Sequence, residues 1–117
     1  MDDLEEHALV VKALTEGLSN CVLWDKQSAQ RVRDNDDLQG LTPAFIRQTL
    51  ISFVRANGGQ AVRQIMEKRP EWRDRHRFFY KVNIPLVGFK KRLFVEIRLT
   101  GYDDPDVPEV MLVSAHF

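Results

Sequence analysis

The stretch RLFVEIRLT, residues 92–100, decides the fold. Apolar side chains occupy every second position, at Leu93, Val95, Ile97 and Leu99. The positions between them carry Arg92, Phe94, Glu96 and Arg98. Alternation of this kind, in a run rich in β-branched and aromatic residues, predicts a half-buried strand with one apolar face and one mixed face.

Two further runs have the same character and flank this strand: RFFYKVNI, residues 77–84, and EVMLVSAHF, residues 109–117. The first link, PLVGF, is short and contains Pro85 and Gly88, as a hairpin requires. The second, GYDDPDVP, is longer and acidic. The three strands therefore predict an antiparallel meander. The segment QAVRQIME, residues 60–67, fits a fourth strand or a helix, and the preceding Gly58-Gly59 favours the strand.

Helices are predicted before the sheet. In residues 3–18 apolar side chains recur at helical spacing, at Leu4, Ala8, Val11, Leu14 and Leu18, and this helix is expected to end near residues 17–20. Residues 26–33 read as a short helix, and residues 21–24 as either an extended piece or a helix. The clearest helix follows LTP, with Thr42 as N-cap, Pro43 at the first position and Gly58 past the end. We expect a single α+β domain, residues 1–117, with helices on one face of an antiparallel sheet of three to four strands.

Composition favours an ordinary globular protein. The chain has 117 residues, of which 44% are hydrophobic and 29% charged. The single Cys21 forms no internal disulfide and has no CxxC partner, and the three histidines lie far apart in sequence, so we expect no metal site and no cofactor. The first residues are acidic, unlike a secretory signal, and no apolar run is long enough for a membrane span. A cytoplasmic protein without membrane contacts is expected.

Charge is distributed unevenly although the total is zero. Residues 1–40 contain four basic and nine acidic side chains, a net charge of −5, whereas residues 60–98 contain eleven basic and four acidic ones, a net charge of +7. A basic face attracts polyanions such as RNA. The alternative is that the acidic front half neutralises the basic back half within the fold.

Two basic clusters predict phosphate contacts. In RPEWRDRHRFFYKV, residues 69–82, the cations include Arg75, Arg77 and Lys81, and Trp72 supplies a plane on which a base can stack. In FKKRLF, residues 89–94, Lys91 and Arg92 stand at the entrance to the next strand. The alternatives are a solvated approach to a strand for the first cluster, and protection of a strand edge by lysines for the second.

The last strand ends in VSAHF, and its His116 is the main candidate for proton transfer. Cleavage of RNA by its own 2′-hydroxyl requires a general acid or base and cations that stabilise the phosphorane. Arg98 on the neighbouring strand suits the second task, and Tyr80 or His116 the first. A histidine at this position is equally compatible with a merely exposed residue. No P-loop, nucleophile elbow or dinucleotide fingerprint is present.

The order of these motifs resembles a known superfamily. SAQRVRD at residues 28–34, LTPAFIRQTL at residues 41–50, the Gly58-Gly59 break and a meander closing on VMLVSAH resemble small toxin nucleases of the RelE, colicin-D and MqsR type. The resemblance spans about residues 26–116. It implies N-terminal helices with a four-stranded antiparallel sheet, and RNA cleavage without a metal by basic, tyrosine or histidine side chains on that sheet. Arg31 is the one residue carried over from the first helical motif, which lacks the histidine often found there.

Two functional hypotheses follow. The first is a metal-independent toxin-type ribonuclease, with Tyr80, Arg98 and His116 as catalytic residues, RNA as substrate and an antitoxin as a protein partner. Its nucleic-acid-binding residues are Arg31, Trp72, Arg75, Arg77, Lys81, Lys91 and Arg92. The second is a non-catalytic interaction or regulatory module of a mobile-element or regulatory system, which binds protein partners or forms a homodimer.

Overall fold

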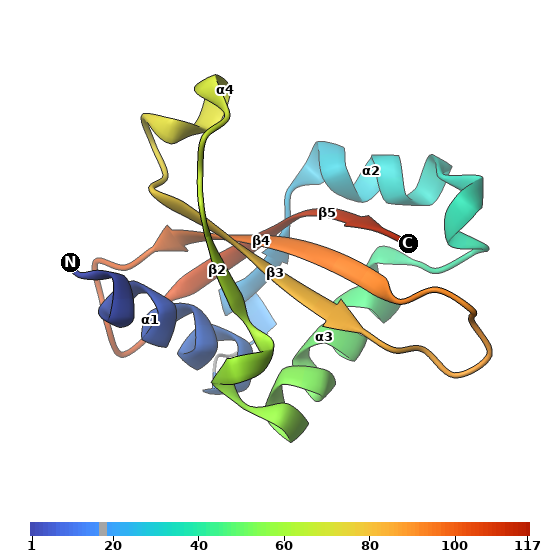
Figure 1. Cartoon of the computed structure of the whole chain (residues 1–117), viewed down its shortest axis with the longest axis horizontal. Helices are drawn as coiled ribbons and strands as arrows, with labels where there is room; N and C mark the ends of the chain where they lie inside the picture. The colour runs from blue at the N-terminus through green and yellow to red at the C-terminus, as the bar shows by residue number, and fades with distance from the viewer. Residues whose placement is uncertain (17–18) are drawn as a thin grey trace.

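A five-stranded sheet organises the chain, and the computed structural model describes residues 1–16 and 19–117 (Figure 1). The strand order is β1-β5-β4-β3-β2. The predicted meander is confirmed, because β2 to β5 pair antiparallel in sequence order. The four strands are β2 Arg63–Met66, β3 Phe78–Ile84, β4 Leu93–Gly101 and β5 Glu109–His116. The preference for a strand within residues 60–67 was therefore correct.

The fifth strand corrects the expected sheet. β1 (Val22–Trp24) pairs parallel with β5, so the sheet is mixed and has one strand more than the largest number expected. Three residues are too few to show the alternation of a strand, and the partner of β1 lies almost ninety residues away in sequence. Parallel pairing also needs a long crossover, which here contains every element from α2 to β4. Local sequence signals therefore could not identify this pair.

Two helices cover one face of the sheet, α1 (Asp3–Glu16) and α3 (Pro43–Asn57) (Figure 1). The start of α3 is as predicted, since the hydroxyl of Thr42 accepts a hydrogen bond from the Phe45 N–H at 3.1 Å. Its end is also as predicted, at Gly58, whose φ of +83° favours glycine.

The buried face of α1 differs from the predicted one. Val10, Ala13 and Leu14 are buried, whereas Leu4 is 83% exposed and Ala8 is exposed too. Because residues 8–11 are all apolar, helical spacing defines two possible apolar stripes, and packing selects the stripe through Val10. Leu18, which belonged to the predicted stripe, lies outside the described residues, as does part of the predicted helix end.

The remaining helices lie elsewhere. α2 (Lys26–Asp34) follows β1 directly and runs beside β5, and the Asp25 N–H donates to the Leu112 carbonyl at the junction (Figure 1). α4 (Pro70–Arg73) connects β2 to β3 and lies on the face opposite α1 and α3. Short 3-10 turns occupy Ser19–Cys21, Asp36–Leu38 and Gly59–Ala61. The expectation of helices on one face therefore holds for α1 and α3 but not for α4.

A bulge in β5 sets the direction of the last side chains. Ile97 pairs with Leu112 and Glu96 pairs with Ser114, so Val113 is an extra residue with no partner of its own. Val110 and Leu112 point into the core before the bulge, and Ala115 does so after it. Strict alternation from Leu112 would turn His116 into the core. The bulge shifts the phase by one residue and places His116 on the opposite face, where it is exposed.

Candidate nucleic-acid interface

The sheet face turned away from α1 and α3, here called the open face, carries the candidate site. Alternation along β3 and β4 buries Tyr80, Val82, Val95 and Ile97 in the core and turns the side chains between them to the open face. Two clusters lie there, side by side along β4, and they meet where Lys81 is opposite Glu96. The covered cluster consists of Glu67, Arg69, Trp72, Glu96 and Arg98. The uncovered cluster consists of Lys81, Asn83, Arg92, Phe94 and His116.

The covered cluster is a neutral network of ion pairs. Arg98 is only 1% exposed, and its Nη2 lies 2.8 Å from Glu67 Oε2 and 3.3 Å from Glu96 Oε2. Arg69 contacts the same two carboxylates, each at 2.9 Å. The charges of two guanidinium groups and two carboxylates sum to zero, so the covered cluster attracts phosphate only weakly.

Trp72 closes the covered cluster. Its ring lies 4.0 Å from the Arg98 guanidinium carbon and 5.1 Å from that of Arg75. The indole is half-buried in these contacts, so it stabilises the buried cation rather than presenting a free plane to a base. Within the described residues, the Nε and Nη1 groups of Arg98 have no hydrogen-bond partner.

The network keeps Glu67 ionised. Hydrogen bonds from the Arg69 side chain, with smaller contributions from the Arg69 backbone N–H and from Arg98, lower the pKa of Glu67 to about 2 although burial opposes this shift. The Glu67 side chain is fully buried. A buried carboxylate with such a low pKa depends on its cations, which makes the cluster a structural element of the fold.

The uncovered cluster joins three strands through ring contacts. Lys81 of β3 places its Nζ 5.3 Å from the centre of the Phe94 ring of β4. The Phe94 ring stacks on the imidazole of His116 in β5, with centroids 5.6 Å apart and planes inclined by 21°. Arg92 donates to the side-chain oxygen of Asn83 and, at 3.1 Å, to its carbonyl. This end therefore combines accessible cations, an aromatic ring and a histidine.

The structure does not bring the three predicted catalytic residues together. Tyr80 lies on the core side of the sheet, fully buried, and donates to Glu6; burial, with this hydrogen bond, raises the pKa of Tyr80 above its ordinary value. Arg98 is opposite Met111, whereas His116 is opposite Phe94. Four residues of β4 separate the two pairs, about 13 Å at the rise of a strand. Arg98 is also only 1% exposed and bound to Glu67 and Glu96, so it is not available to a phosphate beside His116.

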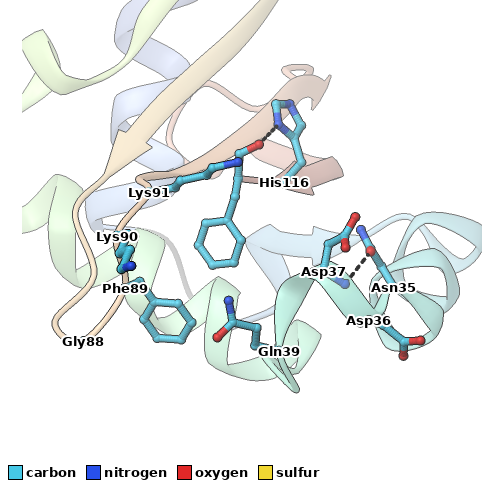
Figure 2. A pocket seen from close by; sticks show the side chains of 10 residues that line it. Asn35, Asp36, Asp37, Gln39, Gly88, Phe89, Lys90, Lys91 and His116 are labelled. Atoms are coloured by element: carbon cyan, nitrogen blue, oxygen red, sulfur yellow. Dashed lines mark hydrogen bonds between the residues drawn. The ribbon is translucent and has the colours of Figure 1, made fainter.

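The predicted nucleic-acid-binding residues fall into two groups. Arg77 forms an ion pair with Asp3 of α1, and Arg75 and Trp72 belong to the covered end. The other four lie elsewhere. Lys81 and Arg92 are in the uncovered cluster, Lys91 lines a cleft with His116 (Figure 2), and Arg31 of α2 lines a hollow between α2 and β5 that includes Ser114.

Sequence reasoning missed Phe94, Asn83, Glu67 and Glu96. Phe94 had a usable signal, because alternation with Leu93 and Val95 turns it to the mixed face. No local sequence signal indicated that Phe94 pairs with His116, because this pairing depends on the bulge at Val113.

No protein-family model matches the chain, and neither curated proteins nor solved structures give a match. The resemblance to toxin nucleases thus stays a prediction. Among the described residues, no group of three or more His, Cys, Asp or Glu side chains is arranged to hold a metal ion, and no helix there is long and apolar enough to cross a membrane.

Proposed function

We propose that this chain is a toxin-type ribonuclease that binds RNA over the uncovered cluster and cleaves it with His116, by chemistry that needs no metal ion. One observation supports the proposal above all. Cations from three segments lie on or beside the strands next to an exposed histidine, His116: Lys81 of β3 contacts the Phe94 ring on which His116 stacks, Lys91 of the β3–β4 hairpin lines a cleft with His116, and Arg31 of α2 lines a hollow with Ser114 of β5. Convergent cations supply phosphate binding, and Phe94 supplies a ring beside the histidine.

The contact of His116 Nδ1 is compatible with a general base. Nδ1 lies 3.2 Å from the Phe117 oxygen, an acceptor, and a neutral ring that donates from Nδ1 in this contact would keep the Nε2 lone pair for proton transfer. Histidine is the side chain best suited to proton transfer near neutral pH.

In the proposed reaction, His116 Nε2 removes the proton of a ribose 2′-hydroxyl. The 2′-oxygen then forms a bond to the adjacent phosphorus, and the bond from phosphorus to the 5′-oxygen breaks. The 5′-oxygen takes up a proton from water, and the products are a 2′,3′-cyclic phosphate and a 5′-hydroxyl. The surrounding cations stabilise the negative charge of the phosphorane.

The test is incubation of the purified protein with RNA in EDTA, followed by mapping of fragment ends. The wild-type protein should produce 2′,3′-cyclic phosphates, and His116→Ala should lower the rate by about 100-fold or more. Because His116 is exposed, its removal should leave the unfolding transition unchanged. Arg75→Ala is the matched control for Arg92→Ala, since both arginines are exposed and only Arg92 belongs to the uncovered cluster, where it contacts Asn83. Intact RNA with folded wild-type protein would refute the proposal.

A second candidate function, the non-catalytic interaction module, has its own support. β1 and β2 are the two edge strands, and each exposes an apolar side chain, Leu23 at 49% and Met66 at 62%. Exposed edges favour pairing with a strand of another chain. Intact RNA together with a stable dimer in solution, lost on Met66→Lys or Leu23→Lys, would favour this function.

A further inference from the structure

A cleft of about 700 Å³ borders the uncovered cluster and shares His116 with it (Figure 2). Its volume lies within the roughly 300–1,000 Å³ typical of small-molecule sites. One side is the β3–β4 hairpin, with Phe89, Lys90 and Lys91. The other side is the turn between α2 and α3, which contributes Asn35, Asp36, Asp37 and Gln39.

The two sides differ in chemistry. The hairpin side supplies ammonium donors, Lys90 and Lys91, whereas the turn supplies carboxylate and amide acceptors at Asp37 and Gln39. The acceptor side is held in place by its own hydrogen bonds, because Asn35 Oδ1 accepts from the Asp37 N–H and the Asp36 carbonyl accepts from the Gln39 N–H, both at 3.0 Å. An apolar surface completes the lining, since the rings of Phe89 and Phe117 stack with centroids 5.3 Å apart.

We propose that this cleft binds a guanine base of the RNA, an inference that rests on the proposed function. Guanine has two adjacent donors, N1–H and the N2 amino group, on its Watson–Crick edge and two adjacent acceptors, O6 and N7, beside them. The carboxylate of Asp37 matches the donors, and Lys90 and Lys91 match the acceptors. Adenine, cytosine and uracil lack two adjacent donors beside two adjacent acceptors. Phe89 and Phe117 add a surface for the base plane.

The position of His116 connects base binding to cleavage. His116 lines the cleft and also stacks on Phe94 of the uncovered cluster. A guanine in the cleft therefore brings its own nucleotide next to the proposed base, and we expect cleavage adjacent to guanosine.

The test uses mononucleotides as probes of the intact chain, so that binding is read independently of cleavage. Titration calorimetry with 5′-GMP, AMP, CMP and UMP should show at least tenfold tighter binding of GMP. Inosine monophosphate, which lacks the N2 amino group, should bind at least fivefold more weakly than GMP. Equal affinities for all four nucleotides would overturn the inference.

The matched variants are Asp37→Asn in the cleft and Asp103→Asn, an exposed aspartate of the β4–β5 loop. Asp37→Asn should remove the preference for GMP over AMP, whereas Asp103→Asn should retain it. Retention of the preference by Asp37→Asn, with the protein folded, would contradict the assignment.

Failure of this inference is distinguishable from failure of the proposed function. RNA cleavage without any preference for GMP would overturn the guanine site and leave the ribonuclease intact. Selective GMP binding with RNA left intact in EDTA would support the guanine site and overturn the ribonuclease.

Discussion

The two clusters of the open face both contain cations and aromatic rings around β4, but the side chains are arranged differently in each. In the covered cluster both cations meet carboxylates, and Arg98 is removed from water beneath Trp72, whereas the Arg69 side chain is 43% exposed. In the uncovered cluster Lys81 is half-buried against the Phe94 ring, which stacks on His116, and Arg92 is exposed and contacts Asn83. Pairing with buried carboxylates, not local charge density, therefore decides whether an arginine stabilises the fold or is available to a ligand.

The covering segment is the origin of the difference. α4 crosses the open face only at the end where β2 passes to β3, so Arg98 is shielded there and Phe94 is not. Shielding strengthens the attraction between charges and also makes each unpaired charge more costly. The four predictions below test this contrast, in order of decreasing effect.

The largest effect is expected from Glu67→Gln. This change leaves the buried Arg98 without its closest carboxylate, and breaking one side of a buried ion pair costs about 3–5 kcal/mol of unfolding free energy. Urea unfolding measures the loss. The control is Glu16→Gln, which breaks the exposed pair with Lys12 and should cost less than about 0.5 kcal/mol. A loss under about 1 kcal/mol for Glu67→Gln would mean that the covered cluster does not stabilise the fold.

Acid should reproduce part of this effect. Because the pKa of Glu67 is lowered from an ordinary 4.5 to about 2, its contribution to stability is fully present above pH 4.5 and is lost as the pH falls toward 2. Between pH 4.5 and 2 the unfolding free energy of the wild-type protein should therefore fall by up to about 3 kcal/mol more than that of Glu67→Gln. Unfolding free energies of both proteins at several pH values measure the difference. If the unfolding free energies of the two proteins fell equally between pH 4.5 and 2, Glu67 would not be the group that titrates in this interval.

A smaller loss is expected from Trp72→Ala. The indole covers a desolvated guanidinium, a contact worth about 2 kcal/mol. RNA affinity should stay within about twofold of wild type, because this tryptophan is not a free stacking plane. Trp72→Phe is the control and should retain part of the stability. A clear drop in RNA affinity with unchanged stability would restore the sequence-based assignment of Trp72 to base stacking.

The smallest effect on stability is expected at the uncovered end. Lys81→Ala should change the unfolding free energy by less than about 0.5 kcal/mol, since its partner is a half-exposed ring rather than a buried carboxylate. It should reduce the slope of log affinity for RNA against log salt by about 0.7, the value for one phosphate contact on a single strand. Arg75→Ala, the matched cation outside the cluster, should leave the slope unchanged. Equal slopes for wild type and Lys81→Ala would show that RNA does not contact this lysine.

Part of the candidate site was predictable from the sequence. Lys81, Lys91, Arg92 and His116 were identified from their residue types and their positions on predicted elements, and Arg31 from the resemblance to toxin nucleases. The separation of Lys81, Lys91 and Arg92 from Arg75, Arg77 and Trp72 was not predictable, because all six lie in two similar basic stretches, residues 69–82 and 89–94. The burial of Tyr80 was not predictable from the sequence either. Its two neighbours at alternate positions, Phe78 and Val82, are buried with it, and only packing distinguishes the buried face of β3 from the open one.

The sequence by itself determined the three long strands and the helix after Thr42, because alternation, capping and turn residues act between near neighbours in the chain. Only the tertiary structure decided the parallel pairing of β1, the bulge at Val113 that turns His116 outward, and the shielding of Arg98 by α4. Each of these depends on register and contact between residues far apart in sequence. Register carries no local signal, because it arises from the fit of whole elements against one another.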